Sequence, residues 1–311
     1  MSESDSSLQD NAVFLPDQER TDEHIVDVLI EERCPSFVGH WSWPVMRPML
    51  YQMLGYKRAV KMANHLQTLN GPTAFDFLTE DLDMKLVLHH AERMPATGKL
   101  IVAVNHPTGL ADGVAIWKAL RDIRRDLQIF ANADAIRVSE RFSDTIIPVE
   151  WVAEKRSTAK TKETLKRANQ AFQRDECVVI FPSGKLAGKE NGQIIERPWF
   201  PTVVSLARKQ KCHVLPIHIS AENSWLYYFL SRINGELRDI TLFYELLNKK
   251  GAKFEMTFGK LISPEDLAGD AQKVTESLMT YVSYELGDQP DLMFRDRQHT
   301  TNRADTRTPI S

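Results

Sequence analysis

A histidine and an aspartate follow closely on an apolar run in the stretch LIVAVNHPTGLADG, residues 100–113. The apolar run predicts a strand, Pro-Thr-Gly at 107–109 predicts a turn, and the residues around Asp112 predict the start of a helix. A carboxylate there can hold one ring nitrogen of His106 and leave the other free to take up a proton. His106 and Asp112 are therefore candidates for a general base and its orienting partner. The alternative is that Asp112 only stabilises the helix N-terminus.

A second apolar run, CVVIF at 177–181, passes into a glycine-containing turn at 182–184. The backbone N–H groups of such a turn, with cations nearby, could bind a phosphate or a carboxylate. The cations that follow it are Lys185, Lys189 and Arg197. Taken alone, the block fits a solvated loop with surface lysines better than a binding site. Because ligands gather at the carboxyl ends of parallel strands, however, we expect this turn and His106 to share one rim of a sheet.

Short β-branched runs alternate with helical stretches between residues 81 and 290, which we interpret as one domain. The expected strands are 100–104, 128–131, 145–149, 177–181, 213–219 and 254–258. The expected helices are 110–125, 157–173, 199–211, 222–249 with a break near Gly235, and 271–286. Several strands are apolar throughout, which is typical of strands covered on both faces. The alternation predicts the α/β class, with a largely parallel central sheet flanked by helices.

Residues 21–80 predict an N-terminal helical segment of different character. From Met46 the apolar residues recur on one face of a helix, with tryptophans before them and basic residues around and after them. Such a segment suits contact with an anionic membrane surface, and the candidate contacts are Trp41, Trp43, Lys57 and Arg58. Equally, it could be a Met-rich helix packed on the core of the protein. The run WLYYFL at 225–230 is a candidate for lining an acyl-chain groove or for touching the bilayer, with core packing favoured.

The order of four blocks resembles the glycerolipid acyltransferase superfamily, and within it the hemolysin-like, lyso-ornithine-lipid type most. The blocks are NHPTGLADG, IFANADAIRVSERF, VVIFPSG and VLPIHIS, within residues 85–262. The resemblance implies that His106 is the base, that Asp112 orients it, and that Pro216 helps to shape the pocket. It also implies a substrate-binding arginine in the second block, either Arg137 or Arg141. The candidate substrate-binding residues are Asn105, Arg137, Phe181, Pro182, Ser183, Gly184, Lys185 and Arg197.

The sequence departs from the family pattern at two points. Five residues separate His106 from Asp112, where four are commonest, although the hemolysin-like branch shares the longer turn. Ser183 stands where the family's Phe-Pro-Glu-Gly motif has its glutamate, which removes a charge from the head-group pocket. A lysolipid with another head group is therefore a better expectation for the acceptor than glycerol 3-phosphate.

The expected reaction is direct transfer of a fatty acyl group from an acyl thioester to the hydroxyl of a lysolipid. Coenzyme A or acyl carrier protein would carry the thioester as a substrate, and neither a bound cofactor nor a metal is expected. The sequence has no G-x-S-x-G elbow and no cysteine beside the histidine motif, which argues against an acyl-enzyme. One alternative is a non-catalytic lipid-binding or scaffold protein of the same fold, which Ser183 and the longer turn would suit. Another is an acyltransferase with a soluble acceptor, which the aromatic and basic residues at 41–61 disfavour.

Composition limits the partners and the cellular location that can be expected for the protein. The net charge is −3, with 39 basic and 42 acidic residues, and zinc-finger spacing is absent, so no nucleic-acid partner is expected. Three scattered cysteines indicate a reducing compartment. The N-terminus lacks a signal sequence, and no run approaches the roughly 18 apolar residues of a spanning helix. We therefore expect a cytoplasmic protein, peripheral on the inner face of the cytoplasmic membrane, with disordered tails at 1–20 and 291–311.

Overall fold

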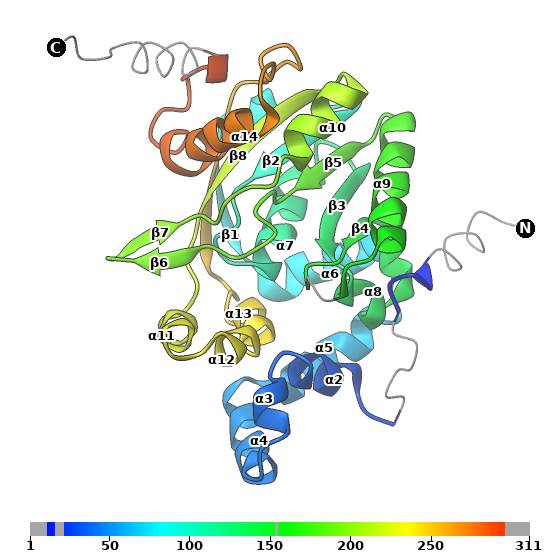
Figure 1. Ribbon diagram of the computed structural model, residues 1–311, viewed down its shortest axis with the longest axis vertical. Helices are drawn as coiled ribbons and strands as arrows, with labels where there is room; N and C mark the ends of the chain where they lie inside the picture. The colour runs from blue at the N-terminus through cyan, green and yellow to red at the C-terminus, as the bar shows by residue number, and fades with distance from the viewer. Residues whose placement is uncertain (1–10, 16–21, 153–154, 296–311) are drawn as a thin grey trace, which may run out of the picture.

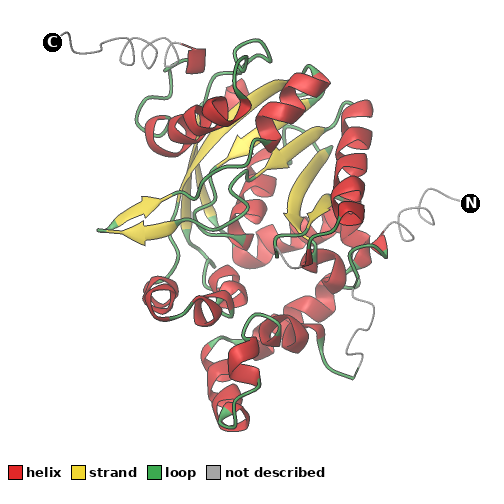
Figure 2. Cartoon of the chain, in the orientation of Figure 1, coloured by secondary structure: helices red, strands yellow, loops and turns green. Residues whose placement is uncertain are grey.

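The computed structural model describes residues 11–15, 22–152 and 155–295. A seven-stranded sheet runs through the molecule, with helices on both of its faces (Figure 1, Figure 2). Its strands lie in the order β1-β9-β8-β2-β5-β3-β4. Their bounds are β1 Lys85–His89, β2 Leu100–Val104, β3 Leu127–Asn132, β4 Ile146–Val149, β5 Cys177–Ile180, β8 His213–Ser220 and β9 Lys253–Phe258. The predicted α/β fold with a central sheet flanked by helices is confirmed.

Strand direction divides the sheet into two parts. β8, β2, β5, β3 and β4 pair in parallel, whereas β9 is antiparallel to β8 and parallel to β1. The sheet is therefore largely parallel, as predicted. The carboxyl ends of the parallel strands form one rim, where His106 follows β2 and Phe181 follows β5.

Alternate residues of β2 enter two separate apolar clusters. Leu100, Val102 and Val104 face the cluster that holds α6 and α7. Ile101 and Ala103 face the cluster that holds α9, α10 and α14. The bounds of these helices are α6 Gly71–Leu82, α7 Leu110–Leu120, α9 Thr158–Gln173, α10 Thr202–Gln210 and α14 Ala271–Thr280. Because helices cover both faces, every residue of β2 and β5 is buried.

The helices near the N-terminus share their core with the sheet. They are α2 Ile25–Glu31, α3 Pro35–Val38, α4 Trp43–Met53 and α5 Tyr56–Leu66, followed by α6. Gly55, with a φ of +71°, lets the chain turn from α4 into α5. Apolar residues of α5 and α6 lie in one cluster with residues of β2 and β9. The segment is helical, as predicted, and its core is continuous with that of the α/β domain.

The two tryptophans of this segment differ in exposure. Trp41 is 85% exposed, whereas Trp43 is 7% exposed and belongs to the core. The prediction that Trp43 contacts a membrane is therefore wrong, because packing leaves it almost no free surface. The other exposed apolar residues of α4 are Val45, Met49 and Met53. Lys57 is exposed, and Arg58 forms an ion pair with Asp81 at 3.0 Å.

Several elements differ from the prediction. The region 222–249 forms three helices, α11 Trp225–Ile233, α12 Gly235–Asp239 and α13 Leu242–Leu247. The predicted break near Gly235 is confirmed, because the side chain of Asn234 caps α12 there. Two elements were not predicted from the sequence: strand β1, and the antiparallel hairpin of β6 Gly188–Glu190 and β7 Gln193–Ile195.

Parts of both predicted tails are ordered, so their predicted extents are wrong. Phe14 is buried, and the guanidinium of Arg167 lies over its ring. Phe294 is buried beside the ring of Tyr281. The rest of the two predicted tails lies outside the described residues. Within the described part of the chain, no helix has the length and apolar character needed to cross a membrane.

Candidate active site

Asn105 anchors the end of β2 to the neighbouring strand. Its side-chain amide donates to the carbonyl of Ile219 at 2.9 Å, and its carbonyl accepts from the N–H of Ile219 at 2.7 Å. Both polar groups are therefore engaged by the backbone of β8. Asn105 was predicted to bind substrate, but these contacts give it a structural role. It fixes the point at which the chain leaves β2 just before His106.

His106 and Asp112 are in direct contact. The distance from Nδ1 of His106 to Oδ2 of the fully buried Asp112 is 2.9 Å. Asp112 also accepts hydrogen bonds from the N–H groups of Thr108 and Gly109, each at 2.9 Å, and from the Thr108 hydroxyl. Because an ionised Asp112 can only accept, Nδ1 of His106 must donate to it, and in the neutral imidazole Nε2 is then left without a hydrogen. The pair thus has the arrangement of a general base and an orienting carboxylate.

The longer turn between the two residues brings its own donors to the carboxylate. Gly109 has a φ of +87°, a conformation that few other residues adopt. A side chain there would also meet Leu186, since a Cβ on Gly109 would lie 2.9 Å from the nearest atom of that residue. The five-residue spacing therefore does not separate His106 from Asp112, because the turn folds over the carboxylate.

The turn at 181–184 lies directly against His106. The ring of Phe181 stacks on the imidazole, with 4.5 Å between the ring centroids. Gly184 has a φ of +57°, and the ring of Trp151 occupies the position that a Cβ on Gly184 would take. The carbonyl of Pro182 accepts from the N–H of Phe200 at 3.0 Å. The two turns that follow β2 and β5 therefore form one site at one rim of the sheet.

The three candidate cations after this turn differ in their surroundings. Lys185 is exposed. Lys189 forms an ion pair with Glu222 at 2.5 Å. Arg197 is half-buried, its guanidinium packs over Gly188, and no ion pair to it is present among the described residues. Of the three, Arg197 is the cation best suited to bind an anion from solution.

Arg137 has a structural role. Its guanidinium bonds both carboxylate oxygens of Glu32 at 2.9 Å and lies 3.4 Å from Asp134. Its side chain is 5% exposed. The prediction that Arg137 binds substrate is therefore not supported by its contacts, because carboxylates from α2 and from its own helix, α8 Asp134–Val138, already hold it.

The residues of this site lie in a segment that matches a known protein family. Residues 85–220, which include the whole His106 turn and the turn at 181–184, match the family model described as Acyltransferase. Lyso-glycine lipid O-acyltransferase of Bacteroides thetaiotaomicron is 27% identical over 197 residues, 60% of this chain and 70% of the relative. Residues 85–220 therefore match an acyltransferase domain, and the chain is similar to lysolipid O-acyltransferases.

Two further proteins resemble this chain. Lyso-glycine lipid O-acyltransferase of Phocaeicola vulgatus is also 27% identical over 197 residues, 60% of this chain and 68% of the relative. Among solved structures, the chain is similar to the 1-acyl-sn-glycerophosphate (LPA) acyltransferase PlsC from Thermotoga maritima. The TM-score is 0.43 at 13% identity, over 83% of this chain and 95% of that chain.

A second carboxyl group, which was not predicted from the sequence, lies beside His106. Oε2 of Glu196, a buried residue just after β7, accepts from the backbone N–H of His106 at 3.0 Å. Burial raises the pKa of Glu196, while the hydrogen bond from His106 and the nearby Ser183 oppose the rise. The Ser183 hydroxyl itself donates to the carbonyl of Lys185 at 2.8 Å. Oε1 of Glu196 has no hydrogen-bond partner among the described residues.

Glu196 changes the interpretation of Ser183. The serine was expected to leave the head-group pocket without the family's carboxyl group. A carboxyl group is nevertheless present beside Ser183, supplied by the hairpin β6–β7 instead of the turn itself. Just before the same hairpin, the N–H of Ala187 donates to the carbonyl of His106 at 3.0 Å. No cluster of His, Cys, Asp or Glu that could hold a metal ion occurs in the described ranges.

Proposed function

We propose that this protein is a lysolipid O-acyltransferase that uses an acyl thioester as donor and His106 as general base. The observation that carries the proposal is the 2.9 Å contact between Nδ1 of His106 and Asp112, which leaves Nε2 free at the rim of the sheet. The relatives named lyso-glycine lipid O-acyltransferases support a lysolipid as the acceptor. The donor would be a thioester of coenzyme A or of acyl carrier protein.

In the proposed step, Nε2 of His106 takes the proton of the acceptor hydroxyl as the hydroxyl oxygen attacks the thioester carbonyl. The new C–O bond forms, the C–S bond breaks, and the imidazolium returns the proton to the leaving thiolate. The products are an ester and a thiol. Asp112 keeps the imidazole in the required tautomer and stabilises the imidazolium that forms between the two proton transfers.

The positions of the nucleophilic side chains favour direct transfer over an acyl-enzyme. Cys177 begins β5 and Cys212 precedes β8, so both lie at the rim opposite to His106, and both are buried. Burial also raises the pKa of the Cys177 thiol to about 12, which disfavours the nucleophilic thiolate. The hydroxyl of Ser183 is buried and donates to a backbone carbonyl. None of these three groups is well placed to attack a thioester beside His106.

Arg197 is the residue we assign to the head group of the acceptor. A half-buried guanidinium with no ion pair among the described residues can bind a carboxylate or a phosphate through two parallel hydrogen bonds. Lys189 could join it by exchanging its ion pair with the exposed Glu222 for the head group. An anionic head group, such as the carboxylate of an amino-acid lipid, fits this pair of cations.

We also infer peripheral binding to the inner face of the cytoplasmic membrane. Trp41 and Trp225 are 85% and 74% exposed, and α4 and α11 lie at the same end of the molecule (Figure 1). Exposed tryptophans and exposed basic residues, such as Lys57, suit the membrane interface. The test is partitioning onto anionic vesicles, which Trp41→Ala/Trp225→Ala should weaken. Leu261→Ala, which removes an exposed apolar side chain elsewhere, should not. Unchanged partitioning of the tryptophan variant would contradict the inference.

The catalytic proposal is tested with purified protein, a panel of lysolipids and both kinds of donor. Lyso-glycine lipid, lyso-ornithine lipid and lysophosphatidic acid are each offered with palmitoyl-coenzyme A or palmitoyl carrier protein, and products are measured by mass spectrometry. His106→Ala should lower the rate of transfer by roughly 10²- to 10⁴-fold. His213→Ala is the matched control, because His213 is exposed at the opposite rim. Near-wild-type transfer by His106→Ala would exclude the mechanism, and no product from any pair would favour a non-catalytic protein.

A further inference from the structure

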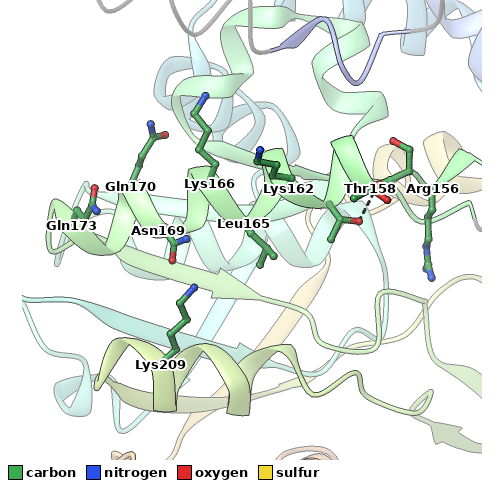
Figure 3. A pocket seen from close by; sticks show the side chains of 11 residues that line it. Arg156, Thr158, Lys162, Leu165, Lys166, Asn169, Gln170, Gln173 and Lys209 are labelled. Atoms are coloured by element: carbon green, nitrogen blue, oxygen red, sulfur yellow. Dashed lines mark hydrogen bonds between the residues drawn. The ribbon is translucent and has the colours of Figure 1, made fainter.

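A broad basic groove runs between α9 and α10 on the face of the sheet that they cover (Figure 3). Its volume is about 990 Å³, and its eleven described lining residues include four cations and no carboxylate. The cations are Arg156, Lys162, Lys166 and Lys209. In Figure 3, Lys209 extends from α10 toward α9, and Leu165 points from α9 toward α10. The rest of the lining is neutral and polar.

The charge of this groove is poorly compensated. No ion pair to Lys162 or to Lys209 occurs among the described residues. The protein as a whole carries a net charge of −3, so this concentration of positive charge is local. Such a surface attracts an acidic partner over several ångströms of solvent.

One end of the groove is built on the candidate active site. Arg156 donates to the carbonyl of Trp151, at 3.3 Å, and its guanidinium lies over the ring of Phe200. Trp151 packs against Gly184, and the N–H of Phe200 donates to Pro182. Trp151 and Phe200 therefore link Arg156 to the turn at 181–184, which lies against His106. A molecule bound at this end of the groove would thus lie near the turn at 181–184.

The shape of the groove selects among anionic partners. A bilayer is flat and would need exposed apolar residues, whereas the groove offers Leu165, at 42% exposed, as its one large apolar side chain. A nucleotide would need cations gathered at one point and an aromatic ring for its base. Here the cations are spread along α9 and α10, and none of the described residues that line the groove is aromatic. An acidic helix laid along α9 matches this spacing better.

We propose that the groove docks an acidic carrier protein, which presents the acyl thioester to His106 on a flexible arm. This inference rests on the proposed function and names the donor for it. Lys162 and Lys209 pair with carboxylates of the carrier on either side of Leu165, which packs on an apolar residue of its helix. The lysolipid reaches the same base from the side of Arg197.

The test compares two donors in a charge-reversal variant, Lys162→Glu/Lys209→Glu. With palmitoyl carrier protein, KM should rise about tenfold at low ionic strength, whereas kcat/KM with palmitoyl-coenzyme A should change by less than about twofold. The difference should shrink as salt is added, because exposed charges are screened. Lys99→Glu/Lys273→Glu is the control with the same change of charge, since both lysines are exposed outside the groove. It should leave both donors unaffected.

Other outcomes overturn the inference in distinct ways. Equal losses with both donors, or no loss with the carrier protein, would exclude docking in the groove. A loss confined to palmitoyl-coenzyme A would indicate a nucleotide site, and loss of anionic vesicle binding alone would indicate a membrane contact. Binding of fluorescent carrier protein, followed by anisotropy, separates docking from catalysis. Salt-sensitive binding without any acyl transfer would refute the proposed function alone, and transfer without measurable carrier binding would refute the docking alone.

Discussion

Two carboxyl groups flank His106, and their surroundings differ. Asp112, from the first turn of α7, accepts four hydrogen bonds, one of them from the imidazole. Glu196, from the end of the hairpin, accepts the backbone N–H of His106 at one oxygen, and its other oxygen has no partner among the described residues. Burial raises the pKa of Glu196. The comparison indicates that Asp112 orients the imidazole ring of His106 and stabilises its positive charge. Glu196 binds the backbone N–H of His106, and the charge of Glu196 changes with pH.

The difference follows from where each group originates. Asp112 lies next to the turn that it stabilises. The N–H groups of Thr108 and Gly109, four and three residues earlier in the chain, therefore reach it through local structure alone. Glu196 approaches His106 from a separate hairpin, and few hydrogen-bond donors lie near its carboxyl group. A buried carboxyl group with few donors is costly to ionise. The two sides of His106 should therefore respond differently to the loss of a charge.

The largest effect is expected from Asp112→Asn. The amide oxygen can replace Oδ2 and accept from His106, Thr108 and Gly109, so the turn should keep its fold. The negative charge that stabilises the imidazolium is lost, however. We expect kcat to fall by roughly 10²- to 10⁴-fold with little change in KM. Steady-state kinetics and circular dichroism on the same preparation test this.

Asp112→Ala is the control that separates charge from turn structure. It leaves the N–H groups of the turn without their acceptor and should lower stability by about 1–3 kcal/mol in addition to activity. Asp112→Asn should not share this loss. Retention of wild-type kcat in Asp112→Asn would show that the carboxylate has no catalytic role, and the contrast between the two sides of His106 would disappear.

A smaller effect, on stability, is expected from Ser183→Glu. This change restores the family's glutamate, but it would bring a second carboxyl group beside the buried Glu196. Two such groups cannot both ionise easily, so the variant should lose on the order of 3 kcal/mol near neutral pH. Denaturant unfolding measures the loss.

Ser183→Gln has nearly the same size without the charge and therefore isolates the electrostatic part. The gap in stability between Ser183→Glu and Ser183→Gln should widen as the pH rises and should narrow when Glu196→Gln is added to both, leaving only the cost of burying one carboxyl group. A gap of unchanged size in the Glu196→Gln background would mean that Glu196 is not the counterpart of the family's glutamate.

The site also shows which features sequence can predict. The apolar runs before His106 and Phe181 predict strands, and parallel strands bring their carboxyl ends together, so both turns could be assigned to one rim. Glu196 could not be assigned, because its position depends on the hairpin β6–β7. The Asn-Gly pair at 191–192, where both residues have positive φ, is a strong hairpin signal that could have revealed it.

Other assignments depended on partners that are distant in sequence. Arg137 is held by Glu32, and Asn105 by the backbone of Ile219, and no local pattern predicts either contact. Trp41 and Trp43 stand two positions apart with opposite exposure. Composition and spacing predicted the helical segment there, but the face that meets the core depends on the packing of the rest of the chain.

The smallest effect is expected from Glu196→Gln, and its sign depends on pH. Because burial raises the pKa of Glu196 above its ordinary value of 4.5, the folded protein binds this proton more tightly than the unfolded chain does. Ionisation of Glu196 therefore lowers stability as the pH rises from 4.5 through the raised pKa. Glutamine can still accept from the N–H of His106 but cannot ionise. The melting temperature of the variant, relative to wild type, should thus increase between acidic and neutral pH.

Activity gives an independent measure of the same residue. At a pH above its raised pKa, the ionised Glu196 favours the imidazolium of His106, so its removal should lower kcat there, by less than about tenfold because Asp112 carries the main charge. Glu196→Ala, which also removes the acceptor for the N–H of His106, should lower kcat further and lose stability at every pH. A pH-independent difference in melting temperature between Glu196→Gln and wild type would mean that Glu196 does not change its charge in the folded protein. Both carboxyl groups would then act as fixed charges, and the distinction between them would be one of position only.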